Sequence, residues 1–231
     1  MKIDGQLLVW LKGVDLAANT ARLTLVGKMG FGGNLAGLRR FDYFRFEIDP
    51  GAAGAGDPEE TVDALKSVLD RQSTFYNRNK HAYSLSCTWK GGARLEGASR
   101  EELQQRWAAD VHNSMKNNSI TDFGGKESGR TVIFKGSKVF LAEVLVEDED
   151  ASARDSIAAK LQSGLGGTRV SCVNEATLWW IALSAQDREE ATALAGKVAV
   201  TTRRDAGLLM NPNFQNVEFV AVNEIKRKSH D

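Results

Sequence analysis

The chain has few of the residues that cross-link a fold or bind metals. Its 231 residues include two cysteines, three prolines and three histidines. Cys87 and Cys172 lie far apart in apolar, strand-like contexts, which excludes a disulfide framework and indicates buried thiols. His81, His112 and His230 occur in no HxH, HExxH or CxxC spacing, so the sequence predicts no metal site built on histidine and cysteine. We expect no bound cofactor.

Long apolar runs and a net charge are also missing. No stretch approaches the roughly 20 apolar residues of a membrane span, and the first five residues lack the apolar core of a signal peptide. Thirty Lys and Arg balance thirty Asp and Glu, which excludes a polyanion binder that acts through overall charge. The 42% of apolar residues is enough for a real core. We expect a cytoplasmic protein that binds no membrane.

Strand patterns and helix start signals alternate in the first half. Residues 43–48 and 83–89 alternate apolar and polar side chains, so each predicts a strand with one wet face, which places Ser84, Ser86 and Thr88 in water. The capping sequence at 57–60 predicts a helix to Arg71, and the one at 99–102 predicts a helix to Met115.

The second half repeats this order of patterns. A strand is expected at 139–147, a helix around Leu161, a strand at 178–183 and a helix after Asp187. If Tyr83 is matched with Leu178 and Ser99 with Asp187, the chain reads as two tandem βαββαβ units, 43–135 and 136–225. This predicts an α+β fold of two ferredoxin-like (split βαβ) units with antiparallel sheets. Residues 131–134 are expected to close the first sheet.

The ends of the chain lie outside these two units. Residues 1–42 are predicted to form an N-terminal β-hairpin, with strands at 7–11 and 21–26, followed by a glycine-rich stretch at 27–37. That stretch lacks the GxxxxGK[ST] order of a phosphate-binding loop, so we expect an ordinary flexible loop, which leaves open whether it orders around a ligand. Residues 226–231 form a charged tail.

A basic segment with interleaved aromatic residues is the strongest candidate for ligand binding. Cations for phosphates and aromatic faces for bases, on an open sheet, are typical of ferredoxin-like RNA binders. The alternative is that the aromatic residues belong to the core and the cations pair with acids such as those at 147–150. The candidate contacts are Arg71, Arg78, Lys80, Lys90 and Arg94, interleaved with Phe75, Tyr76, Tyr83 and Trp89.

Two adjacent tryptophans suggest an interface. Neighbouring residues of a strand point to opposite faces, so Trp179 and Trp180 are not expected to enter one core together. The outward ring would meet the hairpin, a helix or a second copy of the chain. The predicted interface residues are Leu7, Val9, Trp10, Trp179 and Trp180, and we expect a homo-oligomer.

The last strand and the helix stop before it carry a family resemblance. The segment 208–214, Leu-Leu-Met-Asn-Pro-Asn-Phe, followed by a strand at 217–222, resembles the small PurS-type subunit of formylglycinamidine ribonucleotide synthase. Asp57-Pro58 and the Met-Lys-Asn-Asn sequence at 115–118 echo the same pattern in the first half. The resemblance implies a non-catalytic subunit that assembles through its sheets and bridges a larger synthase.

The sequence therefore favours function by association. Its residues converge on no recognisable catalytic group, so the leading expectation is a non-catalytic assembly or scaffold protein that self-associates through its sheets and N-terminal hairpin. RNA binding through 71–100 and a PurS-like bridging role in a biosynthetic complex are the alternatives.

Overall fold

The structure is a computed structural model of the whole chain. It describes residues 2–50, 57–72, 75–116, 119–121, 127–131, 134, 138–149, 152–166, 168–202 and 207–225. The charged tail at 226–231 lies outside the described residues.

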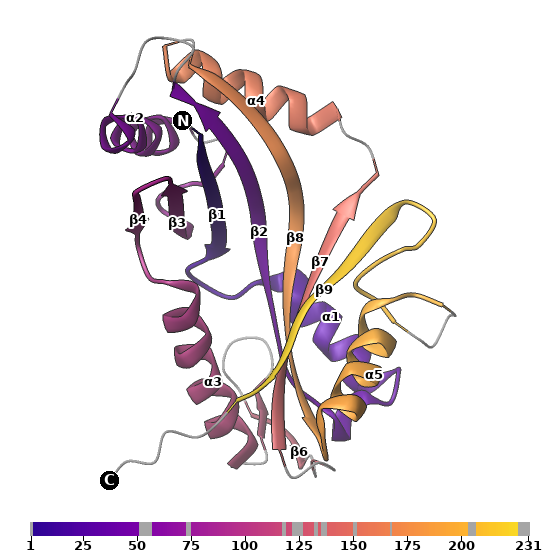
Figure 1. Cartoon of the computed structure of the whole chain (residues 1–231). Helices are drawn as coiled ribbons and strands as arrows, with labels where there is room; N and C mark the ends of the chain where they lie inside the picture. Colours follow the sequence, from indigo (N-terminus) through magenta and orange to yellow (C-terminus); the bar gives the residue numbers. More distant parts are fainter. Residues whose placement is uncertain are drawn as a thin grey trace, which may run out of the picture. The chain divides into compact units, whose positions relative to one another are not determined.

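Helices and strands together form a mixed α+β fold (Figure 1). The helices are α1 (Leu16–Gly27), the 3-10 turn η1 (Phe31–Gly33), α2 (Pro58–Arg71), α3 (Arg100–Lys116), α4 (Ser152–Gly164) and α5 (Arg188–Ala199). The strands are β1 (Ile3–Leu11), β2 (Leu35–Asp49), β3 (His81–Trp89), β4 (Gly92–Glu96), β5 (Ser119–Thr121), β6 (Glu127–Thr131), β7 (Lys138–Asp148), β8 (Arg169–Ala185) and β9 (Gln215–Glu224).

Seven of the described strands form one sheet in the order β4-β3-β1-β2-β8-β7-β9. Strand β1 pairs antiparallel with both β2 and β3, with Ile3 opposite Ile48 on one side and Trp89 on the other. Strands β2 and β3 are therefore parallel, and α2 connects them across β1. The antiparallel pairing is as predicted, but the strand order is not that of two simple split βαβ units. Strand β6, which ends at Thr131, pairs with β5 and does not close the large sheet; residues 132 and 133 lie outside the described part.

The two halves share an element order that differs from the predicted repeat. The first runs β1-α1-β2-α2-β3 and the second β7-α4-β8-α5-β9, and in each the strand that comes first in the chain lies between the other two. Matching strands start about 135 residues apart, as from Ile3 to Lys138 and from His81 to Gln215. The predicted match of Tyr83 with Leu178 is therefore wrong, because the counterpart of β3 is β9. Capping sequences occur before several helices of this chain. Pairing one with another, as Ser99 with Asp187, therefore does not show which elements of the two halves correspond.

The described chain forms two compact units, each drawn from three segments. Unit 1 comprises Met1–Gly13, Phe41–Arg100 and Asp148–Thr177, and unit 2 comprises Val14–Arg40, Glu101–Glu147 and Leu178–Asp231. This grouping differs from the predicted consecutive units 43–135 and 136–225. The reason is that β2 and β8 are long strands, and each has one part in unit 1 and the other part in unit 2.

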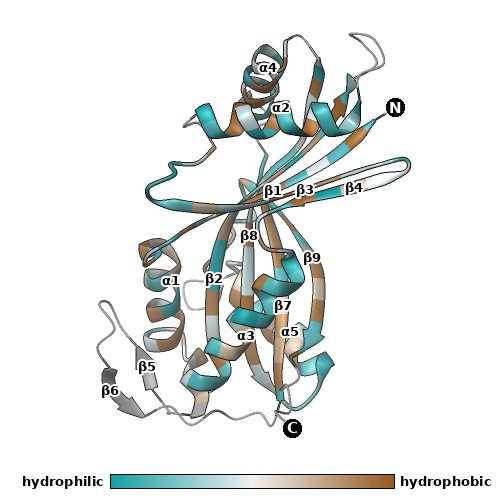
Figure 2. Ribbon diagram, turned by 90° about the vertical axis from the view of Figure 1, so that its left-hand side faces the viewer, coloured by the Kyte–Doolittle hydropathy of each residue, from teal (hydrophilic) through white to brown (hydrophobic). Residues whose placement is uncertain are grey.

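In unit 1, α2 and α4 lie side by side over one face of the strands (Figure 2). Asp57 caps α2 by accepting a hydrogen bond from the Glu59 N–H at 3.1 Å, and Pro58 occupies the first turn, as the sequence predicts. A Cβ on Gly164 of α4 would lie 2.7 Å from Val68, so this glycine permits the close approach of the two helices. Their contribution to the core comes from Val62, Leu65, Val68, Leu69, Ile157 and Leu161.

In unit 2, helices cover both faces of the strands. The side chains of α1 and α5 pack on one face against β7 and on Trp179 of β8. On the other face Trp107 of α3 lies 5.9 Å from Trp180, measured between ring centroids. Gly37 of β2 is also on this face, because a Cβ there would meet Val111 and Trp107 at 3.0 and 3.1 Å. Strand β7 is accordingly hydrophobic along most of its length (Figure 2).

The predicted N-terminal hairpin is wrong in its second strand. Residues 7–11 belong to β1, but residues 21–26 lie within the helix α1. Asp15 begins that helix by accepting hydrogen bonds from the N–H groups of Ala17 and Ala18, at 2.9 and 3.0 Å. Only Ala18 and Leu25, seven residues apart, are buried, so the core-facing stripe has helical spacing. The glycine-rich stretch 27–37 is likewise no continuous loop, since it contains η1 and the start of β2.

Candidate functional site

Arg94, one of the predicted nucleic-acid contacts, is neutralised by three carboxylates of unit 1. Its guanidinium lies 2.7 Å from Asp63, 2.8 Å from Glu96 and 3.3 Å from Glu59. Lys66 completes the group at 2.7 Å from Glu96. Hydrogen bonds from Lys66 and Arg94 lower the pKa of the Glu96 carboxyl below its ordinary value. This network joins α2 to β4 and leaves Arg94 little capacity for a phosphate.

The other predicted cations are only partly available. Arg78 pairs with Asp70 at 2.6 Å, and the Arg71 Nε donates to the Ser67 carbonyl at 3.0 Å. Lys80 and Lys90 are exposed. The acids that pair with Arg78 and Arg94 lie between residues 59 and 96, whereas the sequence interpretation gave those at 147–150 as an example.

The aromatic residues of the basic segment belong to the core of unit 1. Phe75 and Tyr76 are buried, and the half-buried Tyr83 and Trp89 pack against the same core. The rings of Tyr76 and Tyr83 lie against each other at a tilt of 36°, with centroids 4.7 Å apart, and the Tyr76 hydroxyl donates to Asp70. Rings held in this way are not free to stack on bases. The alternative that these aromatic residues belong to the core therefore describes them better than the RNA-binding one.

The predicted interface residues are covered within the single chain. Leu7 and Val9 are buried in the core of unit 1, and Trp10 lies edge-on to Phe41 at 5.9 Å. Trp179 and Trp180 point to opposite faces, as expected, but both are buried, at 7% and 0% exposure. Of the three neighbours considered for the second ring, the hairpin, a helix or a second copy, the structure places a helix there, because Trp107 of α3 lies against Trp180.

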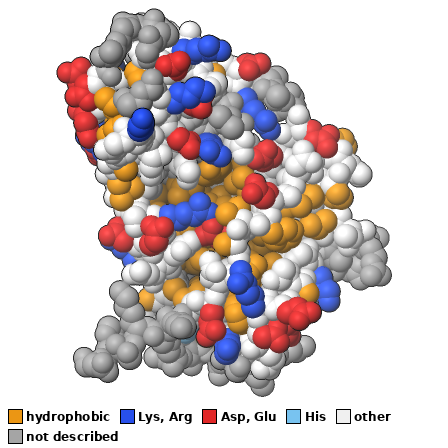
Figure 3. All heavy atoms as spheres, in the orientation of Figure 1, with side chains coloured by type: hydrophobic (Ala, Val, Ile, Leu, Met, Phe, Trp, Pro, Cys, Tyr) orange, Lys and Arg blue, Asp and Glu red, His pale blue; other side chains and the backbone are white. Residues whose placement is uncertain are grey.

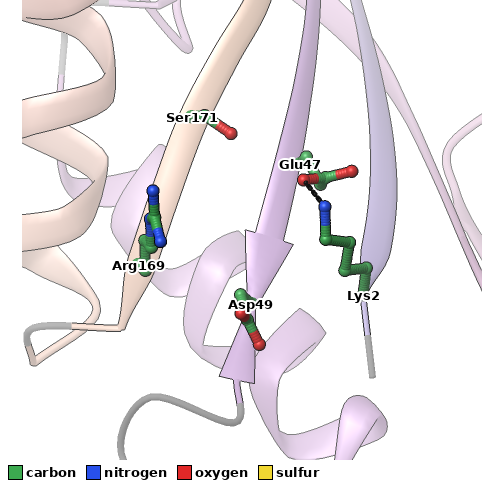
Figure 4. A pocket seen from close by; sticks show the side chains of 5 residues that line it. All are labelled: Lys2, Glu47, Asp49, Arg169 and Ser171. Carbon is green, nitrogen blue, oxygen red and sulfur yellow. Dashed lines mark hydrogen bonds and ion pairs between the residues drawn. The ribbon is translucent and has the colours of Figure 1, made fainter.

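A small cavity lies on unit 1, on the sheet face opposite α2 and α4 (Figure 4). Its volume is about 120 Å³, and its lining is Lys2, Glu47, Asp49, Arg169 and Ser171. The Lys2 ammonium donates to the Glu47 carboxylate at 2.6 Å. The volume equals that of about four water molecules, well below the roughly 300 Å³ of ordinary small-molecule pockets. The charges are balanced and the space is small, so we assign this cavity no ligand.

Cys87, His81 and His112 are each held by burial or by a hydrogen bond. Burial raises the pKa of the Cys87 thiol to about 12, which makes it a poor nucleophile. His81 Nδ1 accepts a hydrogen bond from the Asn77 N–H at 2.9 Å, and His112 Nδ1 lies 2.9 Å from the Ala108 carbonyl oxygen. In the described residues no group of three or more His, Cys, Asp or Glu side chains is placed to hold a metal ion.

An exposed apolar surface follows β9. This strand is last in the strand order, with β7 as its hydrogen-bonded neighbour among the described strands. Phe219 and Val220 are 40% and 45% exposed, and Phe214, just before the strand, is 67% exposed. In the orientation of Figure 1, hydrophobic side chains gather on the surface that β9 crosses (Figure 3). An exposed, apolar strand at a sheet edge is a site for pairing with another chain.

Sequence reasoning missed this edge because a central and an edge strand look alike in one sequence. Residues 217–222 read Val-Glu-Phe-Val-Ala-Val, with one charge, which is equally typical of a buried strand. That β9 is an edge strand, with exposed side chains on both of its faces, becomes visible only when the neighbouring strands are known.

Comparisons with known proteins add no relative. Family models, curated proteins and solved structures give no match to this chain. Within the described residues, no helix is long and apolar enough to span a membrane.

Proposed function

We propose that this protein acts by association, as a non-catalytic assembly or scaffold component that forms homo-oligomers. The observation that carries the proposal is the exposed apolar strand β9 at the edge of the sheet. An isolated chain would leave this surface in water, whereas association would bury it. Trp179 and Trp180, which the sequence suggested as interface residues, are buried and do not contribute to this exposed surface.

The tandem ferredoxin-like interpretation is kept as part of this proposal. It is supported by the connection β2-α2-β3, in which two parallel strands flank an antiparallel one, as in a split βαβ unit. The second half has the same element order in β8-α5-β9, with β7 between the two strands. Association through sheet edges is compatible with such units.

The test is the native mass of the unmodified protein. Light scattering at tens of micromolar should give a multiple of the 25.2 kDa chain mass, and dilution should lower it. A protein that is strictly monomeric at these concentrations contradicts the proposal. Retention on a single-stranded oligonucleotide at low salt would instead favour the RNA-binding alternative.

A further inference from the structure

We propose that two copies of the chain pair antiparallel through β9, around a two-fold axis that places Phe219 opposite Phe219 of the second copy. This inference rests on the proposed function and names the surface and the register through which it operates. The partner is a second copy, and the arrangement joins two sheets edge to edge.

The exposure pattern favours pairing at the edge over docking on a face. Phe219 and Val220 are neighbours and point to opposite faces, yet both are exposed by 40% or more. A partner lying on one face would cover only one of them. A strand added beside β9 places side chains next to both, because its own residues alternate in the same way.

Backbone groups are available at the free edge. The Ile225 N–H donates to the Val139 carbonyl of β7 at 2.8 Å. In an antiparallel ladder alternate residues turn their N–H and C=O toward the same neighbour. Counting back from Ile225 along a regular ladder places the backbone groups of the odd-numbered residues toward β7, and those of Glu218, Val220 and Val222 toward the open edge.

Symmetry and charge then select the register. A two-fold axis perpendicular to the sheet reverses the strand and keeps its faces, so one residue must lie opposite itself. If that residue were Glu218, two like charges would be opposed. With Phe219 on the axis, Glu218 lies opposite Val220, and two exposed rings meet at a non-hydrogen-bonded pair, where side chains are closest.

Single cysteine variants test this register in the full chain. Phe219→Cys should give a disulfide-linked dimer on mild oxidation, because opposed Cα atoms at a non-hydrogen-bonded pair lie about 4.5 Å apart. The matched control is Asn223→Cys, which is also exposed but would lie about 27 Å from its own copy at 3.4 Å per residue. We expect at least tenfold more linked dimer from Phe219→Cys than from Asn223→Cys or the unmodified chain.

A second variant tests the edge without cysteine chemistry. Val220→Pro removes an N–H from the open edge, a place where sheets tolerate proline, and should convert the oligomer to monomer. Its folding is checked by circular dichroism, and Phe214→Ser, which removes an exposed ring outside the strand, should keep the native mass. If the unmodified protein is oligomeric but Phe219→Cys fails to link, or Val220→Cys links better, the register is wrong while the proposed function stands. A monomeric unmodified protein overturns both.

Discussion

The carboxyl of one side chain, Glu96, makes the stability of unit 1 depend on pH. Glu96 receives hydrogen bonds from Lys66 and Arg94 at 2.7 and 2.8 Å, and both lower the pKa of its carboxyl. A carboxyl whose folded pKa is depressed stabilises the fold above its unfolded pKa, about 4.3 for glutamate. The stabilisation is lost as the pH falls through the lower folded value. Solvent reaches this network, so its effect is modest.

The first prediction concerns Glu96→Gln. The variant should be less stable than the unmodified protein at pH 7. The difference should shrink as the pH falls below the unfolded pKa of about 4.3, and it should vanish below the lower folded pKa, where the native carboxyl is protonated as well. Urea unfolding at a series of pH values from 7 to 3 measures it. Glu149→Gln, at an exposed position of unit 1 outside the helices and strands, is the control and should track the unmodified protein. Parallel curves for Glu96→Gln and the unmodified protein would contradict the role of this carboxyl.

Burial along β3 gives the second prediction. Leu85 is 1% exposed in the core of unit 1, so Leu85→Asp should destabilise by several kcal/mol, enough to unfold this unit. The expectation that Ser84 lies on a wet face is wrong, since it is 4% exposed. Thr88, on the same face as Ser84, is the exposed position and lies opposite Asp4, so Thr88→Lys opposes no like charge and should stay within about 0.5 kcal/mol. Chemical denaturation compares the two variants, and equal losses would refute the assignment of faces.

At the scale of elements, helices were predictable where a cap and an apolar stripe agreed. Asp57 and Asp187 were identified as caps, and each accepts a hydrogen bond from a backbone N–H of the first turn. Asp15 does the same for α1 but was missed, because the Leu-Thr-Leu-Val sequence at 23–26 imitates a strand. In the fold, Leu23 of that run is 36% exposed, so the apparent alternation does not correspond to burial.

The third prediction follows from this cap. Asp15→Ala should lower the free energy of unfolding by about 1 kcal/mol, because two backbone N–H groups of α1 lose their acceptor. The ion pair between Asp15 and Arg40, at 3.2 Å, is lost as well. Asp15→Asn keeps the capping oxygen and loses the charge, so it should restore most of the stability. Thermal unfolding of the three proteins measures this, and an equal loss in both variants would assign the effect to the ion pair.

Long-range order was the part of the fold that the sequence did not reveal. Strands were predicted correctly at 43–48, 83–89, 139–147 and 178–183. No local sequence pattern, however, indicates that β1 lies between β2 and β3. Gly5 shows why: a Cβ there would lie 2.3 Å from the ring of Phe46, a constraint that appears only when the two strands are paired. The exposed edge at β9 was invisible for the same reason.

For the whole molecule, the N-terminal segment is central, although the sequence suggested an appendage. Strand β1 pairs with β2 on one side and β3 on the other, and its Ile3, Leu7 and Val9 are buried. Helix α1 contributes Ala18 and Leu25 to the core of unit 2. Each unit therefore takes one element from the first 27 residues.

The last prediction is that deleting residues 1–26 unfolds the protein and does not yield a smaller folded form. Without β1 the partners on its two sides lose their backbone hydrogen bonds, and burying Leu7 alone is worth roughly 2 kcal/mol. Circular dichroism and native mass of the deleted chain test this, with Phe214→Ser as a surface control. We expect loss of ordered secondary structure, together with aggregation of the exposed strands. A deleted chain that stays folded would show that β1 and α1 are peripheral, as an N-terminal hairpin would have been.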